Sequence, residues 1–390
     1  METLNLRQSN LNILYVNSSS FPIAKASSVQ IMQMCEAFAS LGNSVKLVSL
    51  QPYNKPLSTT KIQKYYGVSS NFTIQQLSRK NLPRKFDLFQ IQAIRNNILN
   101  THICYSRGRD IIAPTIGLQM GMHAIVEVHG KPLSLKEKML LKLIQSHRRG
   151  MLVTISDALR KLYINELNFS DKNIIVATGG VDINKFDPYI TIHDARQKLN
   201  MEEGTWIIYT GGLYRGRGLD FLFKAVTDLD IKVMIVGGSN DQQIKEWQYK
   251  AKKQNLNNIY FTGYQSPETI PLYLAAANML IMPYETKVYT ANNEETSSWA
   301  SPLKLYEYMA ASRPIIASNI PMIKDTLIDN HNSLLVEPCN ATAIRKAIKT
   351  LVNNDKLGNH IATNARKDVL KHTWTTRAQH IINNVGKHTL

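Results

Sequence analysis

The segment Ser301–Ala310 (SPLKLYEYMA) combines residue types that could hold a phosphate and a ribose on one short helix. Ser301 is favoured just before a helix, and Pro302 suits the first helical position because its missing N–H has no partner there. Lys304 and Glu307 are three residues apart, so they share one helix face. Amides at a helix start attract phosphate, and a carboxylate one turn later can take two ribose hydroxyls. An ordinary capped helix with a surface ion pair fits the same spacing, which does not choose between the two.

The longer segment SPLKLYEYMAASRPIIAS resembles the donor-site signature of the family 4 glycosyltransferases of the GT-B fold. The resemblance implies that Ser301, Pro302 and Leu303 line the diphosphate of a nucleotide sugar. It also implies that Glu307 holds the ribose. Many members carry a second acidic residue eight positions earlier, which contacts the donor sugar, and here that position is Trp299.

A glycine-rich turn, TGGLYRGRGLD, follows the predicted strand 205–209 and precedes a helix that we expect to begin at Leu219. Such a strand, turn and helix can bind phosphate, although the G-x-G-x-x-G fingerprint and a Walker-type G-K-[ST] are both absent. The turn resembles the family's G-R-L-x-x-x-K-G segment, with Gly212 where Arg is common and Arg217 where Lys is common. The resemblance implies a diphosphate contact for Arg217, and we hypothesise that Arg215 replaces the missing Arg.

Three further residues follow two predicted strands. Gly263 and Tyr264 come after strand 258–261 and match the place where the family's backbone reads the nucleotide base. His129 comes after strand 124–128 and matches, in E-V-H-G, a family histidine that faces the donor sugar. Residues just past the carboxyl ends of parallel strands are where open α/β sheets place their chemistry. A loop histidine bonded to backbone is the alternative for His129.

Composition predicts a two-domain protein of the cytoplasm. The chain has 390 residues, 44% of them hydrophobic, and lacks any apolar run long enough to span a membrane. Its start has no basic region followed by a long apolar stretch, so we expect no secretory signal. The three cysteines are few and widely spaced, which fits a reducing compartment better than a disulfide framework or a zinc site.

The net charge of +17 is concentrated in the first half of the chain. Residues 1–180 hold 22 Lys and Arg against 9 Asp and Glu, an excess of 13 positive charges. This asymmetry favours an anionic partner, either a glycan or lipid-linked acceptor or the inner face of an anionic membrane that the protein binds peripherally. The basic amphipathic segment 132–147 is expected to be a helix that either lies on such a membrane or packs on its own sheet with its lysines in water.

Apolar strands alternating with helices predict an α/β fold, with a first β-α-β unit made of strand 11–16, a helix and strand 44–50. The resemblance implies the GT-B fold, in which two Rossmann-like doubly wound domains face each other across a cleft. We expect an acceptor-side domain over 1–180, a nucleotide-sugar domain over 181–370, and a last helix, 371–390, returning to the first domain. Residues 51–100 are expected to be irregular, and 285–300 to be a loop that orders over the donor.

The resemblance predicts a glycosyltransferase that moves a sugar from a nucleotide diphosphate to an acceptor hydroxyl in polysaccharide, lipopolysaccharide or glycolipid synthesis. Similar members retain the anomeric configuration and need no metal or cofactor. The D-x-D sequence at 228–230 lies between a helix and a strand and is interpreted as a solvated turn. Two alternatives stay open: a nucleotide-sugar epimerase or hydrolase of the same fold, and a basic nucleic-acid-binding protein, which would lack any recognised binding motif.

Overall fold

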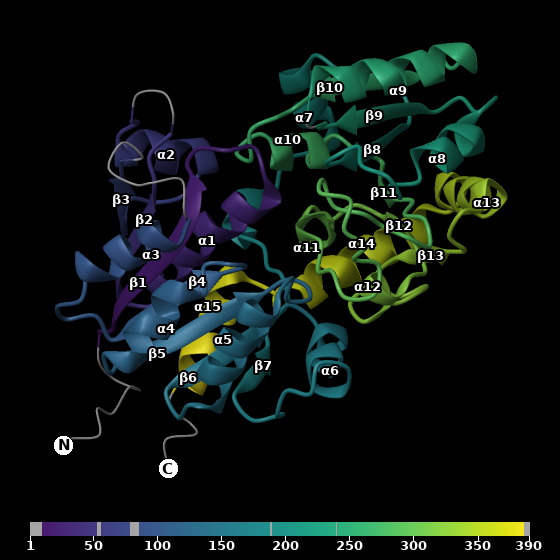
Figure 1. Ribbon diagram of the computed structural model, residues 1–390. Helices are drawn as coiled ribbons and strands as arrows, with labels where there is room; N and C mark the ends of the chain where they lie inside the picture. Colours follow the sequence, from purple (N-terminus) through teal and green to yellow (C-terminus); the bar gives the residue numbers. More distant parts are fainter. Residues whose placement is uncertain (1–9, 53–55, 79–85, 188, 239, 386–390) are drawn as a thin grey trace. The chain divides into compact units, whose positions relative to one another are not determined.

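The computed structural model (Figure 1) describes residues 10–52, 56–78, 86–187, 189–238 and 240–385. The chain divides into two units. The first consists of Met1–Gly179 together with Trp374–Leu390, and the second is Gly180–Thr373. Each unit is built on a parallel sheet with helices between successive strands, which confirms the predicted α/β class.

The first unit has a seven-stranded sheet in the order β3-β2-β1-β4-β5-β6-β7. Its strands are β1 Asn12–Ser20, β2 Ser44–Leu50, β3 Thr73–Leu77, β4 Ile103–Arg107, β5 His123–Val128, β6 Gly150–Thr154 and β7 Ile174–Val176. Its helices are α1 Ala26–Ser40, α2 Thr59–Tyr66, α3 Phe86–Arg95, α4 Ile112–Gln119, α5 Leu135–Ser146, α6 Asp157–Asn165 and α15 Trp374–Asn384. The middle residues of the central strands are mostly apolar and buried, as is typical of a parallel sheet with helices on both faces.

The second unit has a six-stranded sheet in the order β10-β9-β8-β11-β12-β13. Its strands are β8 Trp206–Thr210, β9 Lys232–Val236, β10 Ile259–Gly263, β11 Met279–Met282, β12 Ile315–Ser318 and β13 Leu334–Val336. Its helices are α7 Ile192–Leu199, α8 Leu219–Val226, α9 Asp241–Lys253, α10 Ile270–Ala275, α11 Leu303–Ala310, α12 Pro321–Lys324, α13 Ala341–Val352 and α14 Asp355–Val369, with the 3-10 turn η2 Ile183–Phe186 before them.

Both sheets reverse their strand order at one point, between β1 and β4 in the first unit and between β8 and β11 in the second. Ligands of open α/β sheets bind at the carboxyl ends of the strands at such a reversal, because the loops there diverge and leave a crevice. The glycine-rich turn follows β8 directly, and the segment that leads into α11 follows β11. The fold therefore brings both predicted phosphate-binding segments to the reversal point of the second sheet.

Two sequence predictions were wrong in detail. Residues 51–100 are not irregular, since they contain α2, β3 and α3; four of the basic residues in this stretch fall in 79–85, outside the described residues. Strand β1 runs to Ser20, beyond the predicted strand 11–16, because it pairs with β2 as far as Leu50 after a register shift. Within the part of the chain that the structure describes, no helix is long and apolar enough to cross a membrane.

Helix α15 belongs to the first unit although it ends the chain, and it packs against α1. In Figure 1 it is the yellow helix beside the purple α1. Helix α14 belongs to the second unit, and the chain passes from the second unit to the first between Thr373 and Trp374.

Candidate functional site

The glycine-rich turn after β8 lies against neighbouring backbone so closely that side chains would not fit. A Cβ on Gly218 would lie 1.6 Å from the carbonyl oxygen of Pro283, and the φ of +70° at Gly218 also favours glycine. The amide of Gly211 donates to the carbonyl of Val236, 2.8 Å away, at the end of the next strand. These contacts hold the turn at the carboxyl ends of β8 and β9.

Lys304, on the first turn of α11, turns its side chain into this glycine-rich turn. Its Nζ lies 3.8 Å from the centre of the Tyr209 ring and 2.8 Å from where a Cβ on Gly211 would be. The Nζ is buried and has no hydrogen-bond partner among the described residues. Burial, and then the nearby Arg217 guanidinium, lower the pKa of Lys304 well below its ordinary value. The Glu307 carboxyl opposes this shift of the pKa, but it is not hydrogen-bonded to the Lys304 amine in the part of the chain that the structure describes.

The two arginines of the glycine-rich turn, Arg215 and Arg217, both lie against tyrosine side chains. The Arg217 guanidinium lies 5.1 Å from the centre of the Tyr284 ring, and the Lys304 Nζ lies 5.4 Å from the same ring. Arg217 also donates to the carbonyl of Tyr289 at 3.1 Å, and the Arg215 guanidinium lies 4.5 Å from the Tyr289 ring. The structure thus gathers three cationic side chains around two tyrosines, and no carboxylate is hydrogen-bonded to any of the three among the described residues.

Helix α11 begins one residue later than predicted. Pro302, not Ser301, is the N-cap residue, and no side chain caps the helix. The Ser301 hydroxyl is instead within hydrogen-bond distance, 2.9 Å, of the Tyr306 hydroxyl, so it is drawn away from the helix amides. Leu303 is then the first helical residue, and the first amides of α11 are left without a side-chain acceptor. An uncapped helix start next to buried cations is an anion-binding arrangement.

The remaining predicted residues of the second unit are Glu307 on α11, Gly263 at the end of β10, and Tyr264 directly after it. Glu307 is half-buried on α11, one turn after Lys304. Burial raises the pKa of the Glu307 carboxyl, while Lys185 and then Lys304 oppose the shift. Gly263 has a φ of +72° and accepts a hydrogen bond from the amide of Gly237, which follows β9. Tyr264, directly after Gly263, is 45% exposed.

His129 lies in the first unit, at the carboxyl end of β5, with both ring nitrogens engaged. Its Nε2 is 2.6 Å from an oxygen of Glu127, and its Nδ1 is 3.0 Å from the Arg107 guanidinium. Because an ionised carboxylate only accepts and a guanidinium only donates, Nε2 carries the hydrogen and Nδ1 is bare. Burial, and then Arg107, lower the pKa of His129 to about 4. The imidazole is therefore neutral at pH 7 and held in one tautomer.

Glu127 is the centre of a buried network that sequence inspection missed. Its carboxylate also accepts from the Tyr105 hydroxyl at 2.5 Å and lies 3.0 Å from the Arg377 guanidinium of α15. Burial alone would raise its pKa, but Arg377, His129 and Arg107 together hold the pKa well below its ordinary value. Glu127 sits inside the apolar run AIVEV, and a carboxylate in a buried strand needs partners. That signal was available in the sequence, whereas nothing there pointed to Arg377.

A second missed residue is Asp110, in the loop after β4. One of its carboxylate oxygens accepts from the amide side chain of Asn17 at 3.0 Å and from the backbone amide of Ser18 at 2.9 Å. Burial raises the pKa of Asp110 to about 6, although the hydrogen bonds from Ser18 oppose the shift. The contacts join the end of β1 to the loop after β4, on either side of the reversal point of the first sheet.

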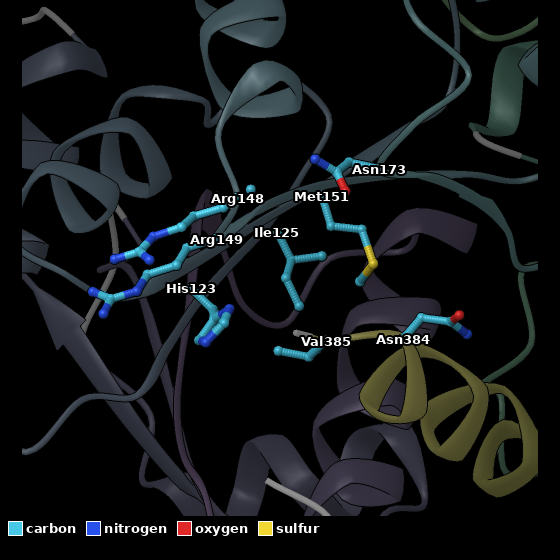
Figure 2. Close-up of a pocket in the computed structure, with 9 residues that line it drawn as sticks. His123, Ile125, Arg148, Arg149, Met151, Asn173, Asn384 and Val385 are labelled. Carbon is cyan, nitrogen blue, oxygen red and sulfur yellow. The ribbon is translucent and has the colours of Figure 1, made fainter. Parts of the chain in front are cut away.

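The pocket drawn in Figure 2 does not bear on these residues. It lies at the amino ends of β5 and β6 and is lined by His123, Arg148 and Arg149, together with the end of α15 at Asn384 and Val385. Parallel sheets bind their ligands at the opposite, carboxyl edge. No group of three or more His, Cys, Asp and Glu side chains that could hold a metal ion occurs in the described ranges.

The family model described as glycosyl transferases group 1 matches residues 191–368, which contain both the glycine-rich turn and α11. The matched residues span most of the second unit, Gly180–Thr373. The cationic side chains around the glycine-rich turn and the uncapped start of α11 lie within the matched residues.

Curated proteins similar to this chain are named as glycosyltransferases. An uncharacterized glycosyltransferase of Methanocaldococcus jannaschii is 24% identical over 167 residues, which cover 43% of this chain and 44% of that protein. The putative teichuronic acid biosynthesis glycosyltransferase TuaH of Bacillus subtilis is 27% identical over 184 residues, which cover 46% of this chain and 43% of TuaH. The chain spans about half the length of the curated relatives that it matches.

Solved glycosyltransferases share the fold. Anabaena Alr3699/HepE, solved in complex with UDP and glucose, has a TM-score of 0.73 and 15% identity over 97% of this chain and all of that chain. The glycosyltransferase from Rickettsia africae ESF-5 has a TM-score of 0.75 and 17% identity over 97% of this chain and 99% of that chain. At these identities the likeness shows the fold alone, and it confirms the predicted GT-B architecture.

Proposed function

We propose that this protein is a glycosyltransferase that moves a sugar from a nucleotide diphosphate to an acceptor hydroxyl. The observation that carries the proposal is the Lys304 Nζ, buried without a hydrogen-bond partner beside Arg217 at the start of α11. A buried amine destabilises a fold unless something compensates it, and a bound diphosphate would do so. The match of residues 191–368 to a glycosyltransferase family supports the same function.

Each residue around the helix start has a distinct role in this proposal. The open amides of α11, with Lys304, Arg217 and Arg215, neutralise the diphosphate as the glycosidic bond breaks. Ser301, Pro302 and Leu303 line that diphosphate, and Gly212 lets the turn approach it closely. Glu307 accepts two hydroxyls of the ribose. Gly263 and Tyr264 contact the base, for which the exposed ring of Tyr264 provides a stacking surface.

The proposed reaction retains the anomeric configuration and uses no metal ion. The cationic side chains and the helix dipole supply positive charge at the leaving diphosphate, which is the role that a divalent cation has in other transferases. His129 is proposed to orient the donor sugar. Both ring nitrogens of His129 are engaged, one by Glu127 and one by Arg107. To contact the sugar, His129 must therefore either break one of these two hydrogen bonds or use the C–H edge of its ring. The anomer of the product, read by NMR, tests retention.

The proposed acceptor is a glycan or a lipid-linked glycan, in cell-surface polysaccharide, lipopolysaccharide or glycolipid synthesis. Two relatives carry names of this kind, TuaH of Bacillus subtilis and the O-antigen chain mannosyltransferase C of Escherichia coli. The excess of positive charge in residues 1–180 supports an anionic acceptor and a peripheral position on the inner face of an anionic membrane.

The decisive experiment compares Glu307→Ala with Glu246→Ala, an exposed carboxylate on α9. UDP and UDP-glucose are the first probes, in a thermal-shift and calorimetric panel of nucleotides and nucleotide sugars. Glu307→Ala should weaken binding by about 10- to 100-fold with no loss of fold, since it removes charge-assisted hydrogen bonds to the ribose. Glu246→Ala should bind like the wild type. Equal affinities for all three proteins would refute the proposed site, and turnover without any acceptor would favour an epimerase or hydrolase.

A further inference from the structure

Helix α5 of the first unit has two apolar faces, and only one of them is packed. Leu141 and Ile144 are buried against β5 and β6. On the other side, Leu135, Met139 and Leu143 are 79%, 70% and 46% exposed. These three residues are spaced by four, so they form one continuous stripe along the helix. An exposed stripe of large apolar side chains on one helix is typical of a surface that binds something else.

Lysines border the exposed stripe on both sides. At about 100° per residue, Lys136 falls on one side of the Leu135–Met139–Leu143 stripe, and Lys138 and Lys142 fall on the other. Lys136 pairs with Asp87 in a solvent-exposed contact of 3.0 Å, which is worth little in water. Lys138 makes no ion pair among the described residues. Arg148 and Arg149 follow the end of the helix, and both are drawn in Figure 2.

Helix α5 itself is poor in acidic side chains. Glu137 is the single acidic residue of α5, and its carboxylate accepts the backbone amide of Leu133 at 2.7 Å, back at the helix start. Leu133, just before the helix, is a further exposed apolar side chain, at 59%. The exposed side of α5 is therefore apolar along its centre and positive along its edges.

We propose that this face of α5 is a membrane-docking surface that lies in the plane of an anionic phospholipid bilayer. Leu135, Met139 and Leu143 would enter the boundary between headgroups and acyl chains, while the bordering lysines extend to the anionic headgroups. A second copy of the chain fits less well, because a two-fold contact along α5 would bring the lysines of both copies together. The inference extends the proposed function by naming the surface that brings the enzyme to a lipid-linked acceptor.

The test uses the full-length protein and co-sedimentation with vesicles of phosphatidylcholine, with or without phosphatidylglycerol. The wild type should pellet with phosphatidylglycerol vesicles and stay in the supernatant with phosphatidylcholine alone. The triple variant Leu135→Gln, Met139→Gln, Leu143→Gln should lose at least about tenfold in partitioning, since it removes the apolar contribution to interfacial binding. A matched variant, Ile328→Gln with Leu370→Gln, changes apolar residues of the second unit that are each 54% exposed and should bind like the wild type.

A second variant separates charge from apolar insertion. Lys136→Gln, Lys138→Gln, Lys142→Gln should weaken binding and flatten its decline with salt, because fewer screened charges remain. Equal partitioning of the wild type and the Leu/Met variant, or absence of wild-type binding to the anionic vesicles, would overturn the proposal. So would a concentration-dependent dimer that the Leu/Met variant abolishes without any vesicle binding.

Measuring UDP binding and vesicle binding on the same variants distinguishes a failure of this inference from a failure of the proposed function. The α5 variants should keep the thermal shift with UDP, which also shows that they are folded, and Glu307→Ala should keep the wild-type partitioning onto vesicles. Loss of vesicle binding in Glu307→Ala would mean that the two sites are not independent, which would contradict the assignment to α5.

Discussion

The Nζ of Lys304 lies 3.8 Å from the centre of the Tyr209 ring, buried and without a hydrogen-bond acceptor among the described residues. The contact of an amine with an aromatic face recovers only part of the hydration that the amine has lost. The free protein therefore holds a cationic side chain in a place that suits it only when an anion is present. We expect stability and ligand binding to respond in opposite directions when this side chain is changed.

Lys304→Met keeps the length of the side chain over Tyr209 and removes the amine. Without nucleotide, the variant should be as stable as the wild type or more stable, by about 1–3 kcal/mol, because an unpaired polar group leaves the interior. Its affinity for UDP should fall about 10- to 100-fold, since a charge-assisted contact with phosphate is lost. Urea unfolding and calorimetry measure the two quantities. Unchanged UDP affinity would contradict the role given to Lys304.

The difference in stability between the wild type and Lys304→Met should depend on pH. The pKa of Lys304 is lowered in the folded protein, whereas in the unfolded chain it is about 10.4. Between the two values the unfolded state binds one more proton, so wild-type stability should rise with pH in this window. Lys304→Met lacks this contribution, and its stability advantage should shrink as the pH approaches 10. Unfolding curves at several alkaline pH values, compared between the two proteins, show the difference.

His129 should remain neutral in the hydrogen-on-Nε2 tautomer across the physiological range. A proton on Nδ1 would face the Arg107 guanidinium, which is why the pKa falls to about 4. Since the unfolded value is about 6.5, His129 favours unfolding as the pH falls from 6.5 towards 4. Nitrogen-15 NMR of the histidine side chains should show one resonance set of this tautomer that does not titrate above pH 5. Titration near pH 6.5 would show that the network around Glu127 is not formed in solution.

Arg377 and Glu127 should be strongly coupled in stability. Arg377→Met leaves the buried Glu127 carboxylate without its ion pair and should cost about 3–5 kcal/mol of unfolding free energy. Adding Glu127→Gln to Arg377→Met should recover part of that loss, because the uncompensated charge is then gone. A double-mutant cycle by urea unfolding measures the coupling. Additive effects of the two substitutions would show that the pair does not interact.

Asp110→Asn should stabilise the protein at alkaline pH. The pKa of Asp110 is about 6 in the fold and about 3.9 in the unfolded chain. Between these two pKa values the Asp110 carboxyl is protonated in the folded protein and ionised in the unfolded chain. The contribution of Asp110 to the free energy of unfolding therefore falls as the pH rises from about 3.9 to about 6. An Asn side chain stays neutral and still accepts from Asn17 and Ser18. The variant should gain up to about 3 kcal/mol at pH 8 and nothing at pH 3.5, as read by chemical unfolding.

Local pattern was enough for much of the fold. Continuous apolar runs such as MLVTI and TWIIY, separated by helical periodicity, predicted parallel strands because a sheet covered on both faces has no polar side. Glycines at the ends of those strands marked the places where backbone segments come close together. The prediction that 51–100 is irregular was wrong because its helices are short, 8 residues for α2 and 10 for α3, and helices of that length depend on contacts with the rest of the first unit.

The sequence by itself determined which residue types stand near the carboxyl ends of the strands: Lys304 and Glu307 on one helix, two arginines in a glycine-rich turn, and a histidine after a buried strand. Only the tertiary structure decided that Lys304 is buried over Tyr209, that Arg377 reaches Glu127 from the last helix, and that the second apolar face of α5 stays uncovered. Periodicity sets the conformation of a segment and the composition of its faces. Which face meets a partner depends on contacts between residues far apart in the chain, and no local pattern records them.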